Sequence, residues 1–135
     1  MYKLLFIEES VATRNLELKN LNTDTIDLCF DDAAVTSFEN FDFMEINEIY
    51  DCKIYLFGEL DDAGENLKYI KDVTIGSRYL SEVANEKGDV YYINKIYVSK
   101  FINAEKILNY KYTRKDIIQV NNVVHPDFNR KSFFN

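Results

Sequence analysis

Apolar and polar residues alternate along several segments of the chain, which is the pattern of a β-strand with one buried face. The first two such segments are residues 15–21 and 25–31, and the turn-forming residues 20–24 between them predict a hairpin. The side chains that we expect to point into the core from this hairpin are Leu16, Leu18, Ile26, Leu28 and Phe30.

Residues 49–60 show the most regular alternation in the chain. One predicted face is fully apolar and consists of Tyr50, Cys52, Ile54 and Leu56. The opposite face carries Tyr55 and Phe57 between charged residues, so we expect part of it to be covered by another element or to serve as a binding surface.

A second hairpin is predicted between residues 78–84 and 90–101. Gly88 lies in the connection and can adopt the positive φ that a short turn requires. Both faces of residues 90–101 are apolar, which is typical of a strand that crosses a barrel or lies between two layers. A last strand is predicted at residues 116–124, where Pro126 follows and ends the regular structure.

Helical signals are few and short. Residues 32–39 and 104–110 are the two candidates, and Asn103 is a suitable N-cap for the second. Residues 61–66 are the most loop-like stretch, and we expect an irregular connection there.

These segments together predict a mainly β fold. Seven or eight short strands with one or two short helices indicate a small antiparallel barrel or a rolled sheet, because both hide the sheet edges; an α+β fold is the alternative. The turn and strand of residues 46–58 resemble the entry into an OB-type or SH3-type barrel. The length of 135 residues suits one β-rich domain over residues 1–135, with residues 126–135 as a less regular C-terminal tail.

The composition agrees with this interpretation. Ten Tyr and ten Phe favour pleated sheets, and with only four Gly and one Pro many turns must be built on Asn and Asp. No stretch has the length of a signal-peptide core or of a membrane-spanning helix, so we expect a cytoplasmic protein that does not engage a membrane. In that compartment Cys29 and Cys52 are expected to be reduced and packed.

Charge is divided unevenly between the two halves of the chain. Residues 1–66 carry sixteen Asp and Glu against four Lys and Arg, whereas residues 67–135 carry seven against twelve, for a total net charge of -7. A partner could therefore meet an acidic surface, a basic one or a mixture, depending on how the halves are arranged in space.

No residue pattern predicts catalysis, a metal site or a cofactor. The one histidine lies in the tripeptide His125-Pro126-Asp127, which is similar to the motif that J-domain co-chaperones carry between two long helices. Here it follows the β-rich residues 117–120, so we interpret it as the end of a strand and a turn. The chain also lacks a nucleophile elbow and a glycine-rich phosphate loop. We therefore expect a non-enzymatic protein without cofactors.

Acidic and aromatic residues are interspersed in residues 37–45. Carboxylates steer the approach of a cationic partner, and exposed rings supply most of the binding energy at many interfaces. Small acidic inhibitors such as immunity proteins are similar in this general property. The sequence thus predicts a binding protein whose partner is another, basic protein. The candidate contact residues are Phe38, Glu39, Phe41, Asp42, Phe43, Glu45, Tyr55 and Phe57.

Single-stranded nucleic acid is the alternative partner. The second half interleaves cations with rings, a mixture that neutralises phosphates and stacks bases in OB-like modules. The residues that would carry this binding are Lys95, Tyr97, Lys100, Tyr110, Lys111, Tyr112, Arg114 and Lys115. The sequence leaves the oligomeric state open.

Overall fold

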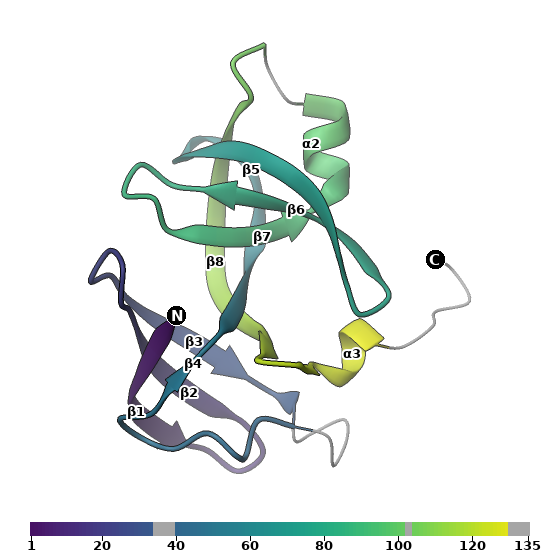
Figure 1. Ribbon diagram of the computed structural model, residues 1–135. Coiled ribbons are helices and arrows are strands. Elements are labelled where there is room, and N and C mark those ends of the chain that lie inside the picture. Colours follow the sequence, from purple (N-terminus) through teal and green to yellow (C-terminus); the bar gives the residue numbers. More distant parts are fainter. Residues whose placement is uncertain (34–39, 102–103, 130–135) are drawn as a thin grey trace.

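The computed structural model describes residues 1–33, 40–101 and 104–129 of the chain. These residues form a mainly β molecule with short helices (Figure 1). In chain order the elements are β1 (Tyr2–Glu9), β2 (Arg14–Asn20), β3 (Ile26–Asp31), β4 (Ile49–Tyr50), β5 (Cys52–Ile75), β6 (Arg78–Ala84), β7 (Val90–Asn94), α2 (Lys95–Phe101), β8 (Ile107–Val120), β9 (Val123–Val124) and α3 (Pro126–Asn129).

The strands form one rolled sheet in the order β4-β1-β2-β3-β8-β5-β6-β7, with β9 beside β8. The predicted mainly β fold with a rolled sheet is confirmed, and the sheet is not closed into a barrel. It is mixed rather than purely antiparallel, because β3 pairs with β8 in parallel at Phe30 and Asp116, and β5 pairs with β7 in parallel at Tyr55 and Tyr92.

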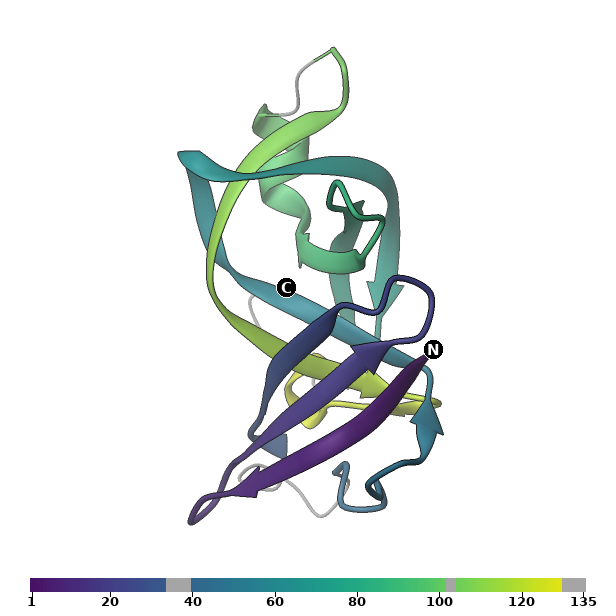
Figure 2. The same ribbon diagram turned by 90° about the vertical axis from the view of Figure 1, so that its left-hand side faces the viewer.

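The long strands β5 and β8 form the spine of the molecule and curve together from one end to the other (Figure 2). Their ladder shifts register at three places, and such bulges bend a strand pair. One shift lies between Leu60 and Glu65, which both pair with Tyr110. The residues predicted as a loop, 61–66, lie instead within β5, where residues 61–64 form a bulge without partners on β8 and pairing resumes at Glu65.

The N-terminal hairpin is confirmed, but one of its strands presents the opposite face to the core. Leu16 and Leu18 are fully buried, as predicted. In β3 the exposed side chains include Ile26 and Leu28, at 53% and 62%. The buried ones are Asp27, Cys29 and Asp31. The alternation of polar and apolar residues predicts the wrong face of β3, because the carboxylates of Asp27 and Asp31 have partners on other strands.

The structure also changes both predictions around residues 90–110. The predicted strand 90–101 ends at Asn94 and continues as α2, whose start is capped by a hydrogen bond from the Ile96 N–H to the Asn94 side-chain oxygen at 3.0 Å. The predicted helix 104–110 is instead the start of β8, since Ile107 pairs with Lys68. Residues 34–39 of the other predicted helix lie outside the described residues.

The last predicted strand, 116–124, is divided between β8 and β9 by a turn at Asn121, whose φ is 52°. The C-terminal tail predicted from residue 126 begins instead with the single helical turn α3. Residues 130–135 lie outside the described part of the chain.

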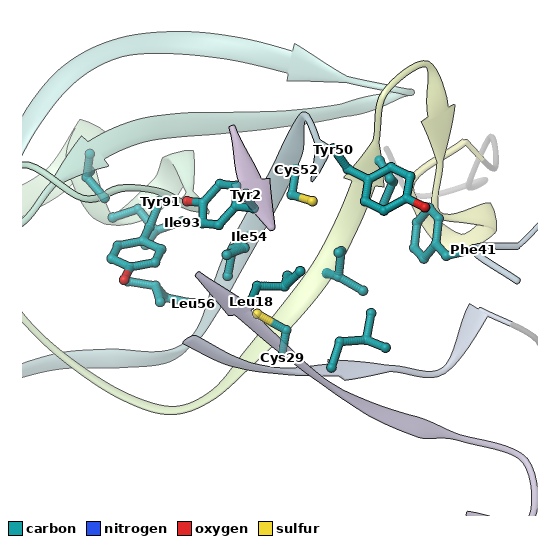
Figure 3. Packing of buried hydrophobic residues seen from close by; sticks show 14 of the residues in the cluster. Tyr2, Leu18, Cys29, Phe41, Tyr50, Cys52, Ile54, Leu56, Tyr91 and Ile93 are labelled. Carbon is teal, nitrogen blue, oxygen red and sulfur yellow. The ribbon is translucent and has the colours of Figure 1, made fainter. Parts of the chain in front are cut away.

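The main hydrophobic core lies between the β1–β2–β3 sheet and the β5–β8 spine, where aromatic and aliphatic side chains pack closely (Figure 3). Cys29 and Cys52 are both buried in it as free thiols, as predicted. A smaller cluster of Ile75, Leu80, Tyr92 and Ile118 packs elsewhere with Tyr55 and Phe128 at its border. Among the described helices, none combines the length and apolar character needed to span a membrane.

Candidate functional site

Residues 41–51, called the acidic segment below, connect the N-terminal sheet to β5 and contain no Lys or Arg. Three of its side chains point inward and fix it: Phe41, Met44 and Tyr50 are all buried. The Tyr50 hydroxyl also accepts a hydrogen bond from the Glu45 N–H at 2.7 Å. The segment is thus held to the core at its start, middle and end.

Backbone hydrogen bonds tie the same segment to β1. The Asn47 N–H donates to the Leu4 carbonyl at 2.7 Å, and the Leu4 N–H donates to the Glu48 carbonyl at 3.0 Å. Asn47 adopts a φ of 73°, a left-handed conformation that Asn tolerates better than most residues. These bonds fix the direction in which the intervening side chains project.

Arg14 anchors the start of the acidic segment. Its guanidinium donates to the Phe41 carbonyl at 2.9 Å and forms a two-nitrogen contact with the Asp31 carboxylate at 2.8 and 3.1 Å. Both side chains of this ion pair are nearly buried, at 11% and 4% exposure. Asp31 also accepts a hydrogen bond from the Ala33 N–H at 3.0 Å. One cation therefore joins β2, β3 and the acidic segment.

The outward side chains of the acidic segment combine negative charge with apolar surface. Its exposed carboxylates are Asp42, Glu45, Glu48 and Asp51. Its exposed apolar side chains are Phe43, Ile46 and Ile49, at 43%, 47% and 51%. The Phe43 ring packs edge-on against Tyr50, with centroids 6.0 Å apart, so part of this apolar surface is held in place.

The protein-binding residues predicted from sequence fall in three different places. Asp42, Phe43 and Glu45 lie exposed on the acidic segment, whereas Phe41 is fully buried, so its predicted role as an exposed contact is wrong. Phe38 and Glu39 lie outside the described residues.

The other two candidates, Tyr55 and Phe57, lie on β5, which follows the acidic segment directly in the chain. Tyr55 is half-buried and packs edge-on against Phe128 at 5.8 Å. Phe57 is 53% exposed and packs under the Arg114 guanidinium at 5.0 Å, with Phe30 on the same guanidinium at 4.8 Å. Sequence reasoning missed Ile46, Glu48 and Ile49, although their alternation with acids was visible.

Most of the residues predicted for nucleic-acid binding are engaged within the protein. Tyr110 is buried and donates to the Leu56 carbonyl at 2.9 Å, so its ring is not available for stacking as predicted. Tyr97, half-buried, donates to the Gly58 carbonyl at 3.2 Å. Tyr112 is half-buried beside Lys115.

The cations of that set differ in how far their charge is compensated. Arg114 contacts the Asp116 carboxylate at 2.5 and 3.0 Å, Lys115 contacts Asp27, and Lys95 lies 3.4 Å from Asp72. Lys100 and Lys111 are exposed and have no ion pair with a described residue.

The acidic and basic stretches of the chain lie side by side instead of forming two separate faces. In the β5–β8 ladder Glu59 pairs with Lys111, and Phe57 pairs with Arg114. A carboxylate from the first half and a cation from the second half are therefore neighbours within one strand pair, and Asp27 of the first half forms an ion pair with Lys115 of the second. The acidic segment has no cation between its negative residues in sequence, and the same is true of Glu59, Asp61, Asp62 and Glu65 on β5.

Three charged or polar residues meet in the core where β3, β7 and β8 approach each other. The buried Asp27 carboxylate accepts hydrogen bonds from the Tyr91 hydroxyl at 2.9 Å and from the Lys115 ammonium at 2.5 Å. Burial lowers the pKa of Lys115, but the hydrogen bond to Asp27, the Asp27 charge and smaller effects of Tyr112 and Cys29 together outweigh it and raise the pKa. Burial together with the Asp27 charge raises the pKa of Tyr91 far above its usual range.

His125 is buried and has both ring nitrogens occupied. Nε2 lies 2.6 Å from the Asp32 carboxylate, and Nδ1 accepts the Asp127 N–H at 3.1 Å. Because Nδ1 is an acceptor, the proton of the imidazole ring is on Nε2, and Nε2–H donates a hydrogen bond to the Asp32 carboxylate.

Asp32, His125 and Asp127 could in principle hold a metal ion, since one ligand atom of each lies within 4.8 Å of the others. A metal on Nε2 would have to displace the proton and would favour a protonated Nδ1, which the Asp127 N–H opposes. The arrangement instead joins the end of β3 to α3, and it offers no free nitrogen for general-base catalysis.

Comparison with known proteins gives no relative. No protein-family model matches the chain. The search of curated proteins finds no match, and neither does the search of solved structures.

Proposed function

We propose that this chain is a non-enzymatic binding protein that docks on a basic protein through the acidic segment. The observation that carries the proposal is the alternation of four exposed carboxylates with three exposed apolar side chains on a segment without cations. Such a surface combines long-range attraction with apolar contact area, the two properties that speed and stabilise protein association.

The rigidity of the acidic segment supports the proposal. Phe41, Met44 and Tyr50 bury one side of it, and the bonds to Leu4 and from Arg14 hold its backbone. A surface that is already in its binding conformation loses less conformational entropy when a partner binds. This suits an inhibitor of the immunity-protein type, which covers a cationic site on its target.

The proposal is tested with two triple variants that remove the same charge. D42N/E45Q/E48Q removes three of the four exposed carboxylates of the acidic segment, and E59Q/D62N/E86Q removes three exposed carboxylates elsewhere. We expect wild type and the second variant to capture a basic protein from the lysate of the native cell, with affinity that falls as salt rises. We expect the first variant to lose the ability to capture this basic protein. Equal capture by both variants would contradict the proposal.

Retention on an oligonucleotide column at neutral pH separates this function from the nucleic-acid alternative. Binding to phosphates falls steeply with salt, so a nucleic-acid protein is retained at low salt and released as salt increases. We expect the chain to pass through without retention at low salt. Clear retention that is abolished by K100A/K111A would replace protein binding with nucleic-acid binding.

A further inference from the structure

A cavity of about 390 Å³ opens between the start of β6, the junction of β7 with α2, and α3. Its size lies in the range of small-ligand pockets, roughly 300–1,000 Å³. One wall is fixed by the Ser77 N–H, which donates to the Phe128 carbonyl at 2.6 Å and so closes α3 onto the β5–β6 turn (Figure 1). We call this cavity the Arg78 pocket.

Arg78 carries a positive charge into the Arg78 pocket. Its Nε and Nη2 atoms donate to the Asp127 carbonyl oxygen at 3.4 and 3.3 Å, and its Cζ atom lies 5.8 Å from the centre of the Phe128 ring. These contacts orient the guanidinium without neutralising it. Within residues 1–33, 40–101 and 104–129, no carboxylate forms an ion pair with Arg78.

A second cation lines the same pocket. Lys95 lies at the start of α2 and contacts Asp72 at 3.4 Å, with both side chains a little under half exposed. An ion pair that is this exposed contributes little free energy, so a bound anion can compete with Asp72 for the ammonium group. The pocket therefore offers one oriented guanidinium and one ammonium that can turn toward a ligand.

The remaining walls present flat rings. Tyr79, which is 68% exposed, lines the pocket, and so do Tyr55 and Phe128, whose rings pack edge-on against each other. A planar group can stack on an exposed Tyr ring, and the lining also includes Ser99 on α2, whose hydroxyl donates to the Lys95 carbonyl at 3.2 Å. Rings beside an oriented arginine are a combination that selects ligands with an aromatic part and an anionic part.

We propose that the Arg78 pocket binds a small molecule in which a planar ring carries an anionic group, either a phosphate or a carboxylate. The anionic group pairs with Arg78 and recruits Lys95, and the ring lies against Tyr79. This site is independent of the acidic segment, because its charge has the opposite sign and none of its lining residues lies within residues 41–51. Either proposal can therefore fail without the other.

The test is a titration followed by NMR of the backbone amides, with three probes. AMP supplies a ring with a phosphate, indole-3-acetate supplies a ring with a carboxylate, and adenosine supplies the ring of AMP without its charge. We expect at least one anionic probe to bind with a dissociation constant below about 1 mM and to shift amides of residues 77–80 and 94–99. Adenosine should bind at least about tenfold more weakly than AMP if AMP is the ligand that binds.

Substitutions distinguish binding in the Arg78 pocket from nonspecific electrostatic attraction of the anionic probes to the protein. Arg78→Ala should weaken the anionic probe at least about tenfold, because a charge-assisted hydrogen bond is lost. Ser99→Phe keeps Arg78 and fills the cavity, so it should also abolish binding. Arg114→Ala is the matched control, since Arg114 lies over the Phe30 and Phe57 rings elsewhere on the surface. Failure of both anionic probes, or equal loss with Arg114→Ala, overturns the proposal.

Discussion

The Tyr91 hydroxyl donates a hydrogen bond to the Asp27 carboxylate at 2.9 Å, and both side chains are buried between strands that are 64 residues apart in the chain. The Lys115 ammonium completes the group from a third strand. A buried carboxylate is stable only when its charge and its lone pairs have partners, so this group joins the N-terminal sheet to the second half of the molecule.

Removing one member of this group should be costly. We expect Lys115→Met to lower the free energy of unfolding by about 3–5 kcal/mol, because it leaves the Asp27 charge buried without a cation. Tyr91→Phe should cost less, about 1–3 kcal/mol, since it removes one hydrogen bond and keeps the ring. Urea denaturation measures both. A smaller loss for Lys115→Met than for Tyr91→Phe would show that Asp27 is not held by charge.

The pKa of Asp89 predicts how the free energy of unfolding depends on pH under acidic conditions. Burial raises the pKa of Asp89, but hydrogen bonds from Thr23, Thr25 and Asn85 outweigh this and lower it below the ordinary value of 3.8. A carboxyl group with a lowered folded-state pKa stabilises the protein fully above its unfolded-state pKa, and this stabilisation is lost as the pH falls through the folded-state pKa.

We therefore expect Asp89→Asn to lose stability at neutral pH and to show a shallower decline of unfolding free energy below about pH 4. Glu86→Gln in the same turn region is the control, because Glu86 is exposed. Unfolding followed by circular dichroism between pH 2 and pH 7 gives both curves. Parallel curves of unfolding free energy against pH for Asp89→Asn and wild type would contradict a lowered pKa of Asp89 in the folded protein.

The two cysteines should react slowly in the folded protein. Burial raises the pKa of the Cys29 thiol, and burial with the nearby Asp51 charge raises that of Cys52 to about 12. At pH 8 only about one in ten thousand Cys52 thiols is then ionised, and the thiolate is the reactive form. We expect two thiols to react with Ellman's reagent in denaturant and almost none on the same timescale without it. Rapid reaction of either thiol in the native state would contradict the buried placement.

Gly58 and Gly88 should respond differently to alanine. At Gly58, where the β5–β8 ladder shifts register, a Cβ atom would lie 2.1 Å from the Lys111 carbonyl oxygen, so the strands would have to separate. At Gly88 nothing lies within 4 Å, and only its φ of 90° is unfavourable for alanine. We expect Gly58→Ala to cost more than about 3 kcal/mol and Gly88→Ala about 1–2 kcal/mol. Thermal unfolding compares them directly.

Phe41 and Phe43 distinguish the inner and outer sides of the acidic segment. Phe41→Ala should cost about 3–5 kcal/mol, because it removes a fully buried ring. Phe43→Ala should change stability by less than about 1 kcal/mol, because its ring is 43% exposed, and it should weaken partner capture if the proposed function is correct. A stability loss of similar size for both would mean that Phe43 has a structural role.

Local pattern was sufficient to predict part of the fold and a small part of the candidate site. The strands near residues 14–31 and 78–84 and the buried row Cys52, Ile54 and Leu56 follow from alternation with period two. Of the contact residues predicted for protein binding, Asp42, Phe43 and Glu45 lie exposed on one fixed segment. Both predictions, of the strands and of the contact residues, depend only on the types of residues that are neighbours in the chain.

Other features of the fold depend on contacts between residues that are distant in the chain, and the alternation of polar and apolar residues does not predict such contacts. The face of β3 is set by Asp27 and Asp31, which can be buried only because Lys115, Tyr91 and Arg14 come to meet them. Likewise, β5 continues beyond the bulge at residues 61–64 because Glu65 and the residues after it pair again with β8.

The sequence by itself determined a β-rich chain, its first hairpin and an excess of negative charge in the first half. Only the tertiary structure decided where that charge is compensated. The β5–β8 ladder sets Glu59 beside Lys111, and buried ion pairs use Asp27 and Asp31. The physical reason is that Coulomb attraction and desolvation depend on distance in space and on burial, and strand pairing sets both. The carboxylates of the acidic segment stay exposed, with no Lys or Arg among the residues of that segment.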